Sequence, residues 1–290
     1  MNHQFQLAAG SITGRDHLSM GKNNQDAMYS LITDQALISV VCDGCGSCAY
    51  SEVGARLIAR LTVTTIARHL QAALTNDWAS IRHQLLTALQ TIVTTLGGDV
   101  EQTVRDYFLC TIVGVIVAPE NTVLFSLGDG IVLLNGQLVP LGMTANNTPP
   151  YLAYGLLEWL DASRGQQLMA EKWAAMSQFQ CHEWIPTSEV ASVLIGSDGV
   201  LDLIKVADRP LPGKSEAVGQ ISQFWEDDRY FENPDRIRRR LFLINREATL
   251  LDAQTQHLVR YPGLLPDDTT FVVIRSSQPI IPQGANKSDS

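Results

Sequence analysis

Aspartates beside apolar, strand-like runs are the residues of this chain best suited to carry chemistry. The four clearest cases are Asp26 in Asn-Gln-Asp, Asp43 in Val-Cys-Asp-Gly, Asp198 in Gly-Ser-Asp-Gly and Asp267 in Pro-Asp-Asp-Thr-Thr. A related aspartate, Asp129, stands in Leu-Gly-Asp-Gly between two further apolar runs. Taken singly, each of these segments is typical of a simple turn, in which the carboxylate bonds the local backbone and glycine takes a positive φ.

Taken together, the aspartates indicate a cation site. Strand ends can converge on one edge of a fold, so that several carboxylates meet there. Clustered carboxylates repel one another unless cations neutralise them. Oxygen ligands without matching histidines favour Mg²⁺ or Mn²⁺ over zinc.

The elements that must position these aspartates are short strands and two long helices. Residues 36–42 and 190–196 are apolar runs that end in Asp-Gly turns, and residues 270–274 predict a last strand. Helical periodicity begins at Ser51, the expected N-cap, and a second helix is predicted over residues 78–95.

Less regular segments complete the chain. Asn135-Gly136 between two apolar runs is the strongest hairpin signal. Residues 15–24 are expected to form a polar loop, residues 246–258 a helix, and residues 144–183 are weakly patterned. Groups of strands with helices inserted between them favour an α+β fold. No linker-like composition divides the chain, which favours a single domain.

Bulk properties exclude several classes of protein. The 290 residues are 45% hydrophobic and 18% charged, as is ordinary for a globular domain, and the net charge of −9 argues against nucleic-acid binding. No apolar run is long enough to span a bilayer, and no secretory signal is evident. An odd count of five cysteines fits reduced thiols. We therefore expect a cytoplasmic protein with no membrane and no nucleic-acid partner.

In this order, the five motifs resemble those of the type 2C (PPM-type) metal-dependent serine/threonine protein phosphatases. They are Asn-Gln-Asp, Val-Cys-Asp-Gly-Cys-Gly, Ser-Leu-Gly-Asp, Gly-Ser-Asp-Gly-Val-Leu-Asp and Asp-Asp-Thr-Thr-Phe-Val-Val, spread over residues 14–274. The loop Cys45-Gly46-Ser47-Cys48 is similar to that of a bacterial branch. The resemblance implies an α+β fold: a central β-sandwich of two antiparallel sheets flanked by α-helices, in four layers (αββα).

The resemblance also implies a centre of two or more Mg²⁺ or Mn²⁺ ions. It assigns Asp43 to bridge two ions, Gly44 to offer a carbonyl, Asp198 and Asp267 to bind the first ion, and Asp26 to hold a metal-bound water. Asp43, Asp198 and Asp267 are therefore the expected catalytic residues. A metal-bridging water would attack the phosphorus of phosphoserine or phosphothreonine, without a phosphoenzyme.

The chain departs from the family at the phosphate-binding arginine, whose position is occupied by Gly21. Lys22 or Arg15 could supply the charge, although lysine binds as a point charge and not as a fork. His17 is expected to be a polar loop residue; its alternative role is that of a general acid.

The cysteine run Cys42, Cys45 and Cys48 lacks a fourth zinc ligand at short range, since Cys110 and Cys181 do not form a second pair. Small residues packed at a turn are the simpler interpretation, and a redox-sensitive thiol beside the site is the alternative.

These expectations describe one phosphatase domain, a phosphoric monoester hydrolase, over residues 1–276. Residues 142–185 would form a flap-like insert and residues 277–290 a disordered tail. The expected partner is a phosphorylated protein substrate, bound by a monomer that acts in signalling. The alternative is a catalytically weak or inactive module that binds a protein partner.

Overall fold

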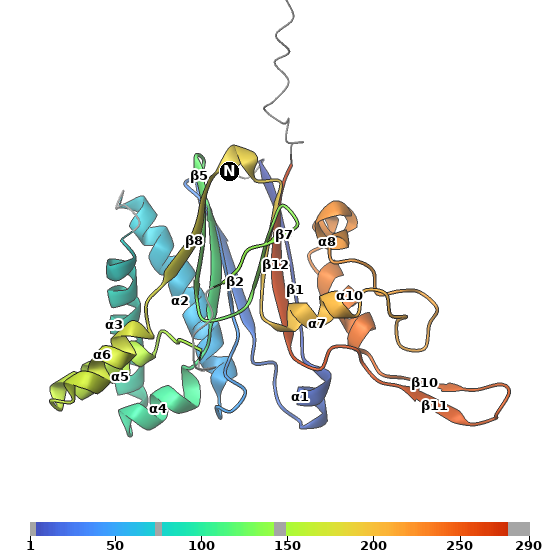
Figure 1. Ribbon diagram of the computed structural model, residues 1–290, viewed down its shortest axis with the longest axis horizontal. Coiled ribbons are helices and arrows are strands. Elements are labelled where there is room, and N and C mark those ends of the chain that lie inside the picture. The colour runs from blue at the N-terminus through green and yellow to red at the C-terminus, as the bar shows by residue number, and fades with distance from the viewer. Residues whose placement is uncertain (1–3, 73–76, 142–148, 278–290) are drawn as a thin grey trace, which may run out of the picture.

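Two antiparallel sheets stacked face to face form the centre of the molecule (Figure 1). The computed structural model describes residues 4–72, 77–141 and 149–277. The first sheet contains, in spatial order, β1 (Phe5–Ile12), β12 (Thr269–Ser276), β9 (Ser192–Gly196), β6 (Ile131–Leu134) and β7 (Gln137–Leu138). The second contains β2 (Ala27–Ile32), β3 (Leu37–Cys42), β4 (Ile112–Val117), β5 (Asn121–Leu127) and β8 (Gln180–Pro186).

Helices cover the outer face of each sheet. Those beside the second sheet are α2 (Ser51–Gln71), α3 (Trp78–Leu96), α4 (Val100–Tyr107), α5 (Tyr154–Ser163) and α6 (Gln167–Ala175). Those beside the first are α7 (Gly199–Lys205), α8 (Gln223–Glu226), α9 (Arg229–Glu232) and α10 (Arg236–Asn245). The short helix α1 (Arg15–Ser19) follows β1, and a 3₁₀ turn (Thr187–Glu189) follows β8. No described helix has the length and apolar character needed to cross a membrane.

Three hydrophobic clusters fill the spaces between these four layers. Alternate residues of β3 show the arrangement: Ile38 and Val40 face α2 and α3, whereas Leu37 and Val41 join the cluster between the sheets. The third cluster lies between the first sheet and α7 to α10, and it includes Phe271 of β12. A strand covered on both faces has no polar side, which explains why β3 is an apolar run interrupted only by the buried Ser39. The predicted αββα sandwich is confirmed.

Several local predictions are also confirmed. The two long helices occur where their periodicity placed them, and Asn135 and Gly136 both take positive φ (50° and 78°) at the β6–β7 hairpin. The expected cap at Ser51 is wrong: Ser51 is the first helical residue, and Tyr50 precedes it without a side-chain cap. The polar loop that begins at Arg15 contains the short helix α1.

The predicted helix over residues 246–258 is wrong. This segment belongs to a two-stranded hairpin, β10 (Ala248–Leu251) and β11 (Leu258–Tyr261), which projects from the body of the molecule (Figure 1). The carboxylate of Asp252 accepts hydrogen bonds from the backbone N–H groups of Gln254 and Thr255, and this turn reverses the chain. A side chain that bonds the nearby backbone competes with helix formation.

Candidate metal centre

The strand ends at one end of the sandwich bring the predicted aspartates together. Asp43 follows β3, and Asp26 precedes its antiparallel neighbour β2. In the other sheet, Asp198 follows β9, and Asp267 precedes the antiparallel neighbour β12. In an antiparallel pair the end of one strand lies beside the start of the next, so each sheet contributes two of these aspartates to the same edge.

A pocket of about 200 Å³ opens at this edge. Its lining is rich in carboxylates and contains no lysine or arginine among the described residues. The lining residues are His17, Gln25, Asp43, Gly44, Cys45, Gly46, Thr111, Pro149, Tyr151, Asp129, Asp198 and Asp267. Of the predicted ligands, Asp43, Gly44, Asp198 and Asp267 therefore share one pocket. Asp26 is not part of the lining.

Burial and mutual repulsion both oppose ionisation of the carboxylates in the pocket. Burial first, and then repulsion from Asp26, Asp198 and Asp267, raises the pKa of Asp43 well above its ordinary value. Burial, and then repulsion from Asp267, likewise raises the pKa of Asp198. A cluster in which ionisation is opposed by neighbouring carboxylates is relieved by a cation. The donor set thus fits hard divalent ions such as Mg²⁺ or Mn²⁺.

Asp26 lies just beneath the pocket, 5% exposed. One carboxylate oxygen, Oδ2, accepts a hydrogen bond of 2.6 Å from Ser197 Oγ, whereas Oδ1 finds no hydrogen-bond partner among the described residues. Burial raises the pKa of Asp26 to about 8, against the hydrogen bond from Ser197. A buried oxygen without a partner is costly, and a water or an ion beside Asp26 would satisfy it.

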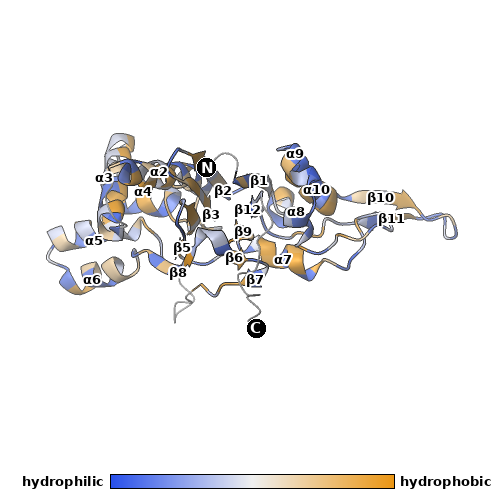
Figure 2. Ribbon diagram, turned by 90° about the horizontal axis from the view of Figure 1, so that it is seen from above, coloured by the Kyte–Doolittle hydropathy of each residue, from blue (hydrophilic) through white to orange (hydrophobic). Residues whose placement is uncertain are grey.

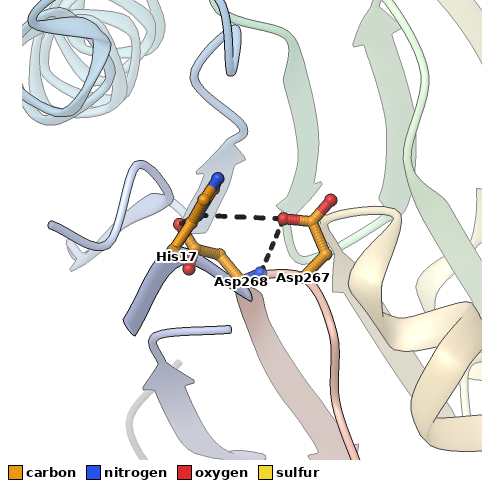
Figure 3. Close-up of side chains that lie close together, drawn as sticks. All are labelled: His17, Asp267 and Asp268. Carbon is orange, nitrogen blue, oxygen red and sulfur yellow. Dashed lines mark hydrogen bonds and ion pairs between the residues drawn. The ribbon is translucent and has the colours of Figure 1, made fainter. Parts of the chain in front are cut away.

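Two adjacent aspartates before β12 have different surroundings (Figure 3). The side chain of Asp267 is 55% exposed and reaches the pocket, where its Oδ1 accepts the backbone N–H of Asp268 at 2.8 Å. Asp268 is buried, and its two oxygens accept the backbone N–H groups of Gly14 (2.7 Å) and Gln25 (2.6 Å). His17 Nδ1 lies 3.0 Å from Asp268 Oδ2 and 4.0 Å from Asp267 Oδ1.

Asp268 therefore fastens both ends of the segment between β1 and β2, which carries His17 into the pocket lining. The role of Asp268 was not evident from the sequence, because the motif Asp-Asp does not show which carboxylate is buried. Nor was that of Thr111, whose hydroxyl accepts the backbone N–H of Asp43 at 3.3 Å. His17, Asp267 and Asp268 together offer ligand atoms within 4.8 Å of one another.

Two glycines permit the close approach of backbone around these aspartates. A Cβ at Gly14 would lie 2.4 Å from the carbonyl carbon of Asp267, and a Cβ at Gly199 would lie 2.0 Å from the backbone oxygen of Asp268. No real side chain tolerates such distances. The Asp267–Asp268 backbone is therefore clamped between the segment after β1 and the start of α7.

The two predicted phosphate-binding residues lie in different places. Lys22 Nζ donates to the carbonyl oxygen of Gly46 at 2.9 Å, so its ammonium group is at the rim of the pocket. Arg15 points away: it donates to the carbonyl oxygen of Gly263 and pairs with Asp16, and it does not line the pocket. Gly21, at the family's arginine position, has a φ of +67° that disfavours any larger residue.

The cysteines form no metal cluster within the described part of the chain, where His17, Asp267 and Asp268 make up the one such group. All five are free thiols. Cys45 lines the pocket, and a hydrogen bond from Cys48 lowers the pKa of Cys45 to about 4. The same hydrogen bond, followed by burial, raises the pKa of Cys48.

A β-sandwich with a carboxylate pocket at the ends of its strands defines the class of this protein. The family described as "Protein phosphatase 2C" matches residues 13–227. The chain belongs to this family, whose members depend on metal ions and act on phosphorylated proteins.

One curated relative is "Serine/threonine-protein phosphatase 3" of Escherichia coli (strain K12), 30% identical over 151 residues. The match covers 48% of this chain and 54% of the relative, so the chain spans about half the length of that protein.

Solved structures of a bacterial serine phosphatase share the fold. One is 12% identical with a TM-score of 0.51 and covers 95% of this chain and 99% of that one. A mutant form of the bacterial serine phosphatase, in which a glutamate replaces an arginine, is 13% identical with a TM-score of 0.52, and the match covers 94% of this chain and 99% of that chain. At this identity the similarity establishes the fold.

Proposed function

We propose that this protein hydrolyses phosphoserine or phosphothreonine in proteins, with two or more Mg²⁺ or Mn²⁺ ions held by Asp43, Asp198 and Asp267. The observation that carries the proposal is the pocket itself. Four carboxylates from separate segments line a space of about 200 Å³ that contains no lysine or arginine among the described residues. Membership of the phosphatase family and the similarity to the serine/threonine-protein phosphatase of Escherichia coli support the same activity.

Some of these residues would bind the ions, and another would position a water. Asp43 and Gly44 would hold the ions from the second sheet, and Asp198 and Asp267 from the first, so the site depends on the two sheets keeping their relative position. When bound, the cations would supply Lewis-acid stabilisation of phosphoryl oxygens and lower the pKa of a water. Asp26 would orient a water through its Oδ1, which has no hydrogen-bond partner among the described residues.

Phosphate recognition would come from the rim. Lys22 places its ammonium group beside Gly46, next to the carboxylates. A lysine there binds a phosphate oxygen as a point charge and restricts its direction less than a fork would. We therefore propose that Lys22 rather than Arg15 contacts the substrate phosphate, since the side chain of Arg15 bonds Gly263 outside the pocket.

The experiment measures hydrolysis of two substrates with each metal ion and with EDTA. Purified protein should hydrolyse p-nitrophenyl phosphate and a phosphothreonine peptide with Mn²⁺ or Mg²⁺, and EDTA should abolish both activities. Metal binding itself is checked separately by the rise in melting temperature when Mn²⁺ is added to metal-free protein. A protein that binds Mn²⁺ but hydrolyses neither substrate would be a partner-binding module, and the proposal would be wrong.

A further inference from the structure

A second pocket lies on the same side of the first sheet as α7 to α10, between the hairpin β10–β11 and the loop that follows α7. Its volume is about 370 Å³, and its lining is mostly apolar. The lining residues are Arg209, Pro210, Leu211, Pro212, Gly213, Lys214, Ser215, Leu250, Tyr261, Pro262 and Leu264. The loop and the hairpin are in contact, because a Cβ at Gly213 would lie 3.0 Å from Ala248 Cβ.

Apolar side chains of the hairpin line this pocket and remain partly exposed to solvent. Leu250 is 45% exposed and Tyr261 is 39% exposed. Pairing of Leu250 with Val259 and of Ala248 with Tyr261 places these side chains on one face of the hairpin. Figure 2 shows the hairpin extending from the molecule with hydrophobic residues along β10. Exposed apolar residues gathered around a pocket mark a binding surface.

The charged residues of this pocket are both cations. Arg209 and Lys214 are exposed, and neither side chain makes a hydrogen bond or an ion pair with another described residue. Neighbouring arginines differ in this respect: Arg240 pairs with Glu216, and Arg260 pairs with Glu247. The charge of Lys214 contributes to the lowered pKa of Glu216, after the larger effect of Arg240. In a chain with a net charge of −9, two cations that form no ion pair among the described residues, beside an apolar pocket, are complementary to an acidic segment with an apolar side chain.

One short segment connects this pocket with the metal centre. Pro262 and Leu264 line the apolar pocket, and Asp267 lines the acidic one. Three extended residues span at most about 11 Å, so a bound peptide could occupy both pockets. The segment is fixed in place, because the carbonyl oxygen of Leu265 accepts the backbone N–H of Arg15 at 2.8 Å.

We infer that the pocket between the hairpin and the loop after α7 is a docking site for the protein substrate. It takes an apolar side chain flanked by acidic residues, about three to six residues from the phosphorylated residue. This inference rests on the proposed function, since the phosphorylated residue is the one placed at the metal centre. The apolar side chain enters between Leu250 and Leu264, and Arg209 and Lys214 contact the acidic flank.

The test compares peptides and variants with Mn²⁺ present. A panel of phosphothreonine peptides carries one leucine followed by two glutamates, moved stepwise along either side of the phosphothreonine, and a matched panel carries serine and glutamines there. Wild-type protein should hydrolyse the best leucine–glutamate peptide with a kcat/KM about tenfold above its matched control.

Two variants should remove that preference. Leu250→Ser, and Arg209→Gln combined with Lys214→Gln, should each lower kcat/KM for the best peptide about tenfold and leave hydrolysis of p-nitrophenyl phosphate within about twofold. Leu251→Ser is the matched control, because Leu251 is exposed on the opposite face of the hairpin. The control for the double charge variant is Arg68→Gln combined with Arg164→Gln, which removes two positive charges from exposed positions elsewhere.

Direct binding separates failure of this inference from failure of the proposed function. A fluorescein-labelled, unphosphorylated leucine–glutamate peptide is titrated by anisotropy in EDTA, and Leu250→Ser should weaken its Kd about tenfold. Equal hydrolysis of both panels, or equal binding by wild type and Leu250→Ser, overturns the docking site even if p-nitrophenyl phosphate is hydrolysed. A concentration-dependent dimer that Leu250→Ser abolishes, with peptide binding unchanged, assigns the pocket to self-association and also overturns it.

Discussion

The acidic pocket at the strand ends and the apolar pocket beneath the hairpin differ in almost every physical respect, although one short segment joins them. The first is lined by carboxylates from both sheets, and burial, followed by repulsion between the carboxylates, raises the pKa of Asp43 and Asp198. The second is lined mainly by prolines, leucines and two cations that form no ion pair with any residue the structure describes. The first site can bind cations, and the second can bind an acidic, partly apolar peptide.

The two pockets also differ in the elements that hold their lining residues in place. The acidic pocket is built on strand ends and on neighbouring backbone packed so closely that a Cβ at Gly14 or Gly199 would clash with it. The apolar pocket is built on a loop and a projecting two-stranded hairpin, and an isolated hairpin is only marginally stable. Chemistry needs fixed geometry, whereas recognition of varied protein substrates tolerates a more adaptable surface. The two should therefore respond differently to mutation.

The largest expected effect is at the acidic pocket. Asp43→Asn removes a charge that all the pocket's cations would share, and we expect activity to fall at least about 100-fold toward p-nitrophenyl phosphate and phosphopeptides alike. Steady-state kinetics measures this, and circular dichroism checks the fold. Asp34→Asn, an exposed substitution in the turn between β2 and β3, is the control. Robust activity of Asp43→Asn would falsify the assignment of the metal centre.

The neighbours Asp267 and Asp268 should have opposite phenotypes. Asp268→Ala leaves the N–H groups of Gly14 and Gln25 without their acceptor, and two charge-assisted hydrogen bonds are together worth about 3 kcal/mol or more. At about 2–4 °C per kcal/mol, the melting temperature should fall by roughly 6–12 °C. Asp267→Ala, at an exposed carboxylate, should keep its melting temperature but lose most activity. Similar melting temperatures for the two variants would contradict the structural role of Asp268.

Stability without metal should decrease as pH rises. The pKa of Asp26 is raised from 3.8 to about 8, so the folded protein binds more protons than the unfolded chain between these values. Its stabilising contribution is present at low pH and is lost as the pH rises through about 8, and the raised pKa values of Asp43 and Asp198 act in the same direction.

In EDTA, the melting temperature should therefore fall by at least about 5 °C between pH 5 and pH 8, as followed by thermal denaturation. Excess Mn²⁺ should reverse the trend at pH 8, because cations bind the ionised carboxylates. Asp26→Asn should flatten the EDTA profile, and Asp34→Asn should not. A melting temperature in EDTA that rises with pH over this range would contradict the raised pKa values.

The smallest expected effect is at the rim. Lys22→Gln removes one exposed positive charge beside Gly46, and we expect KM for p-nitrophenyl phosphate to rise about threefold with little change in kcat. Arg15→Gln should leave KM for this small substrate unchanged, since its side chain bonds Gly263. The reverse result would move the phosphate contact from Lys22 to Arg15.

The residue patterns of the sequence indicated an α+β fold and a set of candidate ligands, and the family resemblance of its motifs implied the sandwich. Strands buried on both faces are mostly apolar, so β3 and β9 were evident from composition alone. The Asp-Gly motifs at their ends were visible for the same reason, and their order was sufficient to indicate the family. The long helices α2 and α3 followed from periodicity.

Tertiary structure decided which of two adjacent aspartates is exposed to the pocket. Asp267 and Asp268 are chemically identical in the sequence, and they differ only because the N–H groups of Gly14 and Gln25 arrive from more than 240 positions away. It also decided the hairpin β10–β11, where local periodicity suggested a helix. There the Asp252 turn and cross-strand pairing outweigh a weak helical propensity.

The apolar pocket could not be predicted from the sequence, for a related reason. Its walls come from the loop after α7 and from the hairpin, separated by more than thirty residues, and neither is unusual alone. That Arg209 and Lys214 lack ion-pair partners within the described residues is a property of what packs beside them. Residue types and local spacing thus determined the carboxylate chemistry, whereas long-range packing decided which groups are buried, paired or free to bind.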